Sequence, residues 1–136
     1  MNTEQLKHHE VPLRKPMVPV ILVCDSITSP ANAGTLIRLC DAFGVDQLFF
    51  CGHRMNLESN RLKKTARSTE KQMTILQQDS ILTVLQEFSK KRFGLVGLEI
   101  SSTSLALQNY AVTDVGIVPV RGNERGNKPG NSVNVR

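Results

Sequence analysis

Apolar residues fall in short runs that alternate with segments of helical spacing along most of the chain. Five of these runs are mostly apolar and short, as in strands that are buried on both faces of a sheet. They are Val18–Cys24, Val45–Cys51, Met73–Leu76, Leu95–Leu98 and Val115–Val120. Because helical segments separate these strands, we predict an α/β fold whose mostly parallel sheet is covered by helices on both faces.

The first helix is expected to begin near Asn32, whose side chain can cap the free amides of the first turn. Gly44 then supplies the left-handed residue that ends many helices. Between them, the apolar positions at helical spacing are Leu36, Ile37, Cys40 and Phe43.

Two further helical segments follow the second strand. The basic segment Asn60–Lys71 is expected to form a short helix and a loop. Ser80 is expected to cap an amphipathic helix that closes with the cations of residues 90–92, because the helix dipole is negative at that end. The inward positions of this helix are expected to be Ile81, Leu82, Leu85 and Phe88.

The polar residues 1–17 show no period, so we predict an N-terminal arm followed by one domain over 18–136. The run Val18–Cys24 is far shorter than a membrane span, and the charges of the arm exclude a signal peptide.

The three cysteines form no C-x-x-C pair and lie in apolar segments, which indicates small buried side chains in a reducing cytoplasm. We therefore expect a cytoplasmic protein without a membrane or a metal site.

Positive charge is concentrated in the middle of the chain. Between Arg54 and Arg92 there are nine Lys and Arg residues against four Asp and Glu residues. Such a segment indicates a surface for a polyanion, although a solvated helix face would give the same pattern. With six aromatic residues in the chain, a nucleic acid would be bound mainly through its phosphates.

The common nucleotide and hydrolase motifs are missing from the sequence. There is no G-x-G-x-x-G after the first strand, no phosphate-binding P-loop and no G-x-S-x-G. The segments 32–38 and 122–134 remain as candidates for a site. Arg38 stands among apolar residues, which favours a functional or paired guanidinium, and an ion pair with Asp41 or Asp25 is the alternative.

Three segments, in order, resemble the motifs of the SpoU/TrmH family of SPOUT RNA methyltransferases. Motif 1 is similar to Asp25-x-x-x-x-Pro30-x-Asn32-x-Gly34-x-x-x-Arg38 with the Asp-Ala-Phe-Gly-Val run of 41–45. The basic stretch 61–71 resembles the region after the second strand of that family. Motif 2 resembles Gly-Asn-Glu-Arg-Gly at 122–126, and motif 3 resembles Asn-Ser-Val-Asn-Val at 131–135. The resemblance covers about 18–135.

The resemblance implies a C-terminal trefoil knot, S-adenosylmethionine as cofactor, a homodimer, and methylation of a ribose 2′-hydroxyl in tRNA or rRNA. The catalytic residues it implies are Asn32, Arg38, Glu124, Ser132 and Asn134. The cofactor would be held by Leu98, Glu99, Gly122, Ser132 and Val133. The residues expected to contact RNA are Arg38, Arg61, Lys63, Lys64 and Arg67.

The chemistry of methyl transfer defines what Arg38 could do. The family proposal makes the arginine of motif 1 the base that takes the 2′-hydroxyl proton. Because a guanidinium has a pKa above about 12, we expect Arg38 instead to bind a phosphate and stabilise negative charge on the oxygen. A transiently neutral Arg38 is the alternative.

The sequence departs from the family between motifs 2 and 3. The family has a helix and a strand there and a long helix afterwards, whereas seven residues, 125–131, separate Glu124 from Ser132 in this chain. The chain is either truncated or degenerate, or its segments are joined across missing ones. If it were complete, we would expect weak activity, a trefoil knot that is incomplete, and at the extreme a non-catalytic RNA-binding remnant. Besides the methyltransferase and the RNA-binding remnant, the third functional hypothesis is an α/β domain of an unrelated class.

Overall fold

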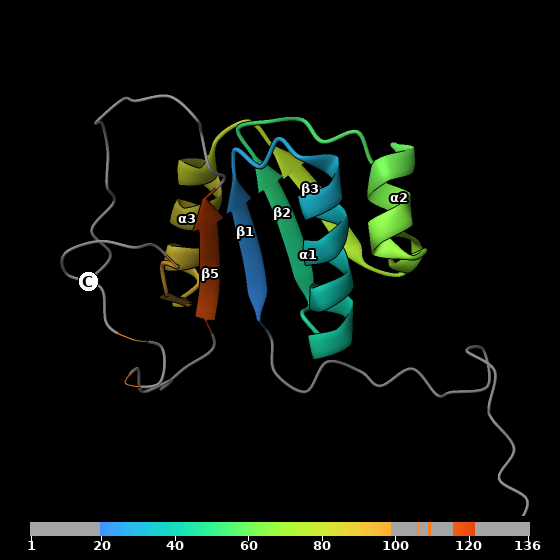
Figure 1. Cartoon of the computed structure of the whole chain (residues 1–136). Helices are drawn as coiled ribbons and strands as arrows, with labels where there is room; N and C mark the ends of the chain where they lie inside the picture. Colours follow the sequence, from blue (N-terminus) through green and yellow to red (C-terminus); the bar gives the residue numbers. More distant parts are fainter. Residues whose placement is uncertain (1–19, 99–105, 107–108, 110–115, 122–136) are drawn as a thin grey trace, which may run out of the picture.

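A computed structural model describes residues 20–98, 106, 109 and 116–121, which form a parallel sheet with helices packed against it (Figure 1). Within the described residues, the sheet has five strands in the order β3-β2-β1-β5-β4, and every pair is parallel. The strands are β1 (Ile21–Asp25), β2 (Gln47–Cys51), β3 (Thr74–Gln78), β4 (Gly94–Leu95) and β5 (Gly116–Arg121). The predicted α/β class and parallel sheet are therefore confirmed.

The helices lie on both faces of the sheet, as predicted (Figure 1). The helices α1 and α2 lie side by side on one face, and α3 covers the other face, where it contacts β1 and β4. The helical segments are α1 (Pro30–Phe43), α2 (Asn60–Ala66), the short 3₁₀ helix η2 (Thr69–Lys71) and α3 (Ile81–Lys90).

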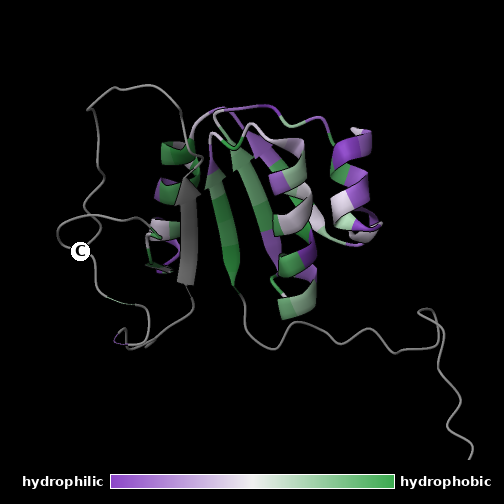
Figure 2. Ribbon diagram, in the orientation of Figure 1, coloured by the Kyte–Doolittle hydropathy of each residue, from purple (hydrophilic) through white to green (hydrophobic). Residues whose placement is uncertain are grey.

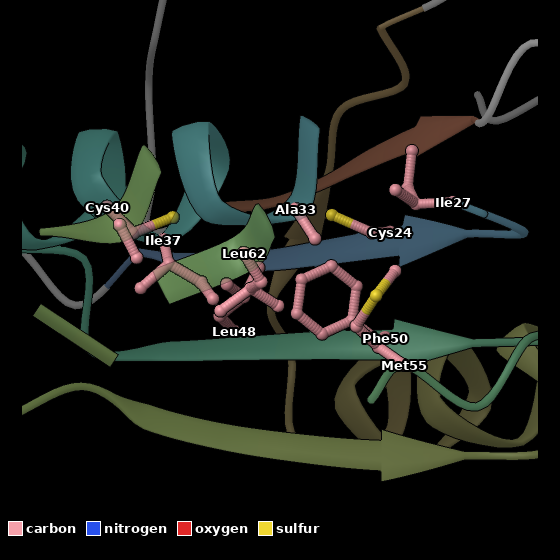
Figure 3. Packing of buried hydrophobic residues seen from close by; sticks show 10 residues of the cluster. Cys24, Ile27, Ala33, Ile37, Cys40, Leu48, Phe50, Met55 and Leu62 are labelled. Atoms are coloured by element: carbon pink, nitrogen blue, oxygen red, sulfur yellow. The ribbon is translucent and has the colours of Figure 1, made fainter. Parts of the chain in front are cut away.

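Alternate side chains of the central strands build one core on each face of the sheet. Cys24 of β1 and Leu48 and Phe50 of β2 pack beneath α1 and α2 (Figure 3). Val23 and Phe49, one position away along the same strands, pack against α3. Because both faces are covered, these strands are apolar at successive positions, 21–24 in β1 and 48–51 in β2 (Figure 2).

The start of α1 differs from the prediction, whereas its end agrees. Ser29 is the N-cap, and its Oγ accepts a hydrogen bond from the backbone N–H of Asn32 at 3.3 Å. The prediction that Asn32 caps the helix is wrong, because Pro30 already has the backbone angle of a first helical residue and starts the helix two positions earlier. Gly44 ends α1 in the left-handed conformation, with φ 68°.

Two other elements also differ in detail. Leu82, predicted to face inward on α3, is 51% exposed, and Val84 is buried in its place. The buried face of α3 is formed by Val84, Leu85 and Phe88, so Leu82 lies to one side of it. β4 is shorter than the predicted 95–98, because its ladder with β5 has only two residue pairs, Gly94 with Gly116 and Leu95 with Ile117. Ser80 precedes α3 but makes no side-chain cap.

The three cysteines are buried and free, as the sequence predicts. Burial raises the pKa of the Cys24 thiol to about 12, and the neighbouring Cys40 and Cys51 thiols add to the effect. Burial likewise raises the pKa of Cys40 to about 11, and that of Cys51 to about 11 with a further contribution from Asp25. These thiols are protonated at neutral pH, so they are core side chains and not nucleophiles.

Some sequence expectations fall on parts of the chain outside the described residues. These are the arm over 1–17 and the trefoil knot of the C-terminal region. Among the described helices, none has the length and apolar character needed to cross a membrane.

The helices α1 and α2 are in close contact at Gly34. A Cβ atom added there would overlap the Oγ1 of Thr65 and the carbonyl oxygen of Leu62, and would lie 3.0 Å from the backbone nitrogen of Ala66. Thr65 Oγ1 also lies 3.1 Å from the carbonyl oxygen of Ala31, to which it can donate a hydrogen bond across the two helices. The absence of a side chain at Gly34 therefore lets the basic helix α2 pack directly on α1.

We expect Gly34→Ala to destabilise the protein, because the added methyl group has backbone atoms of α2 in its way. Overpacking of this kind costs about 1–3 kcal/mol of unfolding free energy, which would lower the melting temperature by several degrees. The matched control is Gly97→Ala, since a Cβ at Gly97 meets nothing within 4 Å. Equal melting temperatures of the two variants in a calorimetric scan would contradict the proposed close contact.

Candidate functional site

The carboxyl ends of the strands meet at one edge of the sheet, which is the upper edge in Figure 1. β1 lies between β2 and β5, and Asp25 at the end of β1 is paired with Arg121 at the end of β5. The chain extends the sheet from β1 through β2 to β3 on one side and through β5 to β4 on the other. In open α/β sheets such a reversal of strand order leaves a crevice between the carboxyl ends, where ligands bind. The candidate site is therefore the edge between β1 and β5.

The two segments predicted to hold a cofactor both lead to this edge. β4 runs parallel to β5, so Leu98 follows β4 in the direction in which Gly122 follows β5. Leu98 is 47% exposed, which leaves an apolar side chain available to a ligand. Glu99, Gly122, Ser132 and Val133 of the predicted cofactor set lie outside the described residues, as do the predicted catalytic residues Glu124 and Asn134.

The loop after β1 is held against the end of β2. The backbone N–H of Ser26 donates to the carbonyl oxygen of Cys51 at 2.8 Å, and Ser26 Oγ donates to Asp25 at 3.1 Å. At Gly52, where φ is +74°, an added Cβ would lie 2.8 Å from Ser26 Oγ and 3.2 Å from Asp25 Oδ1. This close contact fixes the chain between β1 and the start of α1, and so positions the residues of motif 1.

Asn32 and Arg38 both lie on α1 and are both exposed, but the helix does not bring them together. Six residues of an α-helix separate them by about 9 Å along the axis and by about 120° around it. Asn32 is in the first turn, beside the candidate edge, whereas Arg38 lies four residues after Gly34, on the side of α1 that meets α2. Among the described residues, Arg38 forms no ion pair with Asp25 or Asp41, so the ion-pair alternative is wrong.

The predicted RNA-binding cations lie in one layer of the molecule, the layer of α1 and α2. Arg61, Lys64 and Arg67 are exposed on or beside α2. Lys63 differs from them, because its ammonium donates to the Glu58 carboxylate and forms an ion pair with it. The hydrogen bond and the charge of Lys63 lower the pKa of Glu58. The charge of Lys63 is therefore partly neutralised within the protein.

The residues that follow β2 and β3 were not among the predicted site residues. They line a small cavity at the carboxyl edge, formed by Gly52, His53, Arg54, Gln77, Gln78 and Asp79. His53 and Arg54 directly follow a buried strand, at the edge where parallel sheets bind ligands, and this position was the available signal.

Comparison with known proteins identifies the family of this fold. The model of the SpoU rRNA Methylase family matches residues 19–129, which include motif 1 and the Gly-Asn-Glu-Arg-Gly segment 122–126. A similar curated protein is the 23S rRNA (guanosine-2'-O-)-methyltransferase RlmB of Blochmanniella floridana, 23% identical over 118 residues. The similarity covers 87% of this chain and 46% of that protein.

Solved structures share the fold at low sequence identity. The A. aeolicus TrmH/SpoU tRNA modifying enzyme superposes with a TM-score of 0.71 at 23% identity, over 86% of this chain and 59% of that one. The SpoU methyltransferase AviRb from Streptomyces viridochromogenes, in complex with the cofactor AdoMet, gives a TM-score of 0.70 at 19% identity, over 88% of this chain and 46% of that one.

The chain thus spans about half the length of the relatives it matches. Within that length, the family model covers most of the residues, and the strand order places motif 1 beside the end of β5. The chain belongs to the SpoU rRNA Methylase family.

Proposed function

We propose that this chain is part of an S-adenosylmethionine-dependent RNA methyltransferase that methylates a ribose 2′-hydroxyl of tRNA or rRNA. The observation that carries the proposal is that a member of the SpoU family has motif 1 and the end of β5 at one reversal of strand order. The names of its relatives agree with this chemistry, since one is a guanosine 2'-O methyltransferase of 23S rRNA and another is a tRNA modifying enzyme.

The proposed cofactor fits the part of the edge that the structure describes. S-adenosylmethionine, when bound, supplies a methyl group that its positively charged sulfur already activates. Leu98 and the segments after β4 and β5 would hold it, with Glu99, Gly122, Ser132 and Val133 as the further contacts that the family resemblance implies. Since the methyl group is activated, the protein has mainly to align the ribose oxygen with it and to exclude water.

Arg38 would act on the RNA through its charge. The guanidinium is exposed, and among the described residues no carboxylate is paired with it, so it is available to a phosphate. A guanidinium placed near the 2′-oxygen would also stabilise the negative charge that develops there during transfer. Asn32, Glu124, Ser132 and Asn134 complete the proposed catalytic set.

We also propose that the enzyme is a homodimer. Asn32 and Arg38 lie on different sides of α1, so one chain does not assemble the two around a single reacting atom. A site built from both subunits removes this difficulty. The apolar side chains of Leu39 and Phe43, which are 48% and 82% exposed on α1, support a protein contact on this helix.

We expect Arg38→Ala to abolish methyl transfer without unfolding the protein. The loss of a charge that stabilises the transition state reduces turnover by about 100-fold or more. Because Arg38 is exposed and unpaired among the described residues, the melting temperature should be unchanged. Transfer of a radioactive methyl group to bulk tRNA and rRNA measures the activity, and Lys90→Ala on the opposite face is the control. Full activity of Arg38→Ala would contradict the assigned role.

Lys64→Ala should weaken RNA binding more than Lys63→Ala, because Lys63 is paired with Glu58 and Lys64 is not among the described ion pairs. Each phosphate contact that is lost lowers the slope of log affinity against log salt by about 0.7–0.9. Fluorescence anisotropy at several salt concentrations would measure both quantities. If the two variants lost the same affinity, the pairing of Lys63 would have no influence on RNA binding.

A further inference from the structure

The cavity at the carboxyl ends of β2 and β3 lies beside the proposed methyl-transfer site and is not part of it. Its volume is about 100 Å³, and Gly52, His53, Arg54, Gln77, Gln78 and Asp79 line it. Gly52 is the residue that packs against Asp25 and Ser26 at the end of β1. The cavity therefore begins one strand away from the edge between β1 and β5.

The loop that carries His53 and Arg54 is fixed at both ends. On one side, the backbone N–H of Gly52 donates to the carbonyl oxygen of Gln78 at 3.2 Å. On the other side, the Gln77 side chain makes two hydrogen bonds to the backbone of Met55, accepting from its N–H at 2.8 Å and donating to its carbonyl oxygen at 3.1 Å. Met55 is itself 3% exposed, in the core beneath α1. The backbone that carries His53 and Arg54 is therefore held in place on both sides.

The cavity combines groups of opposite charge. His53 and Arg54 are exposed, and neither forms an ion pair with another described residue. Asp79 and Gln78 also line the cavity. A carboxylate at this place repels a bare anion, but it is a good acceptor for a hydroxyl group. The lining therefore fits a ligand that has a phosphate and a hydroxyl group close together.

A ribose-phosphate unit of RNA has this combination. Its phosphate would be bound by the Arg54 guanidinium with the His53 imidazole, and its 2′-hydroxyl would donate to the Asp79 carboxylate. The 2′-hydroxyl is the group by which proteins distinguish RNA from DNA. A guanidinium is suited to the phosphate because its donors match two phosphate oxygens at once.

We propose that this cavity binds a ribose-phosphate unit of the substrate RNA next to the nucleotide that is methylated, with Arg54 and His53 on the phosphate and Asp79 on the 2′-hydroxyl. The inference rests on the proposed function, which makes RNA the substrate. It assigns to the loop after β2 a role in holding the strand across the edge of the sheet, so that the target ribose lies at the end of β1.

The test compares charge-matched variants of the full chain. A fluorescein-labelled single-stranded RNA 12-mer and the DNA 12-mer of the same sequence are titrated by anisotropy at several salt concentrations. Arg54→Gln should lower RNA affinity about 5- to 10-fold and reduce the salt slope by about 0.7. Lys90→Gln, which removes an exposed cation from α3, should change the affinity less than about twofold. If Arg54→Gln and Lys90→Gln behave alike, the phosphate contact is overturned.

The ratio of RNA to DNA affinity tests the hydroxyl contact. Asp79→Ala should lower this ratio about fivefold, the loss expected for one hydrogen bond. Asp46→Ala, which removes an exposed carboxylate before β2 at the opposite edge, should leave it unchanged. An unchanged ratio in Asp79→Ala overturns the ribose contact. Where Asp79→Ala lowers the melting temperature, Asp79→Leu, which keeps the approximate size of the side chain and has no hydrogen-bond acceptor, replaces it.

Two further outcomes separate this inference from the proposed function. If the wild-type chain binds neither the 12-mer nor bulk tRNA, both the proposed function and the inference are wrong. If the wild-type chain binds RNA but the cavity variants change neither the RNA affinity nor the ratio of RNA to DNA affinity, the inference alone is wrong. Saturable binding of adenosine 5′-monophosphate that Arg54→Gln removes, without any effect of that variant on the 12-mer, would assign the cavity to a free nucleotide and overturn the RNA assignment.

Discussion

The candidate site at the carboxyl edge of the sheet depends on β1, the central strand, which is hydrogen-bonded to β2 and to β5. Its pairing with β2 and with β5 is in register along all five residues, and it ends at Asp25 beside Cys51 on one side and Arg121 on the other. A strand held in this way cannot shift by one position without moving Val23 and Cys24 out of their separate cores. Because β1 is fixed, the loop after it, the start of α1 and the end of β5 all lie at one defined place.

The position of α1 follows from the same constraint and in turn determines the position of α2. Ile37 and Cys40 are buried on the side of α1 that packs on the sheet. On the neighbouring side, Gly34 has no side chain, so Thr65 of α2 can approach closely. The short helix with the basic residues would make few contacts on its own, since only Leu62 and Ala66 are buried. Direct packing on α1 brings Arg61, Lys64 and Arg67 into the layer that also carries Arg38. The close contact at Gly34 therefore determines where the positive charges of α2 lie relative to Arg38.

The sequence was sufficient for features that depend on local chemistry. It predicted each strand to within a few residues, the left-handed end of α1 at Gly44 and the burial of the cysteines. The prediction was wrong where nearby residues favoured different helix starts or different buried faces. Asn32 and Ser29 are both good capping residues, and Pro30 decides between them. Leu82 is apolar, but the buried side of α3 is set by the contacts of Val84 and Phe88 with the sheet.

Features that join distant parts of the chain could not be predicted from spacing. The strand order places β5 beside β1 although residues 26–115 separate the two strands, and nothing in the local pattern specifies it. The cavity depends on Gln77 reaching back 22 residues to the backbone of Met55. The family motifs were recognised because they are sequence patterns. The loop with His53 and Arg54 matches no such motif, and its position directly after a buried strand was the signal that the sequence offered for it.

We propose that the edge between β1 and β5 belongs to a methyltransferase that uses S-adenosylmethionine. The most direct test is a calorimetric titration of the purified chain, its mass verified, with S-adenosylhomocysteine, the product that the cofactor leaves behind. Our account predicts saturable binding near one site per chain. A folded chain of the verified mass that binds no S-adenosylhomocysteine would contradict it, and RNA binding without methyl transfer would then be the function to examine.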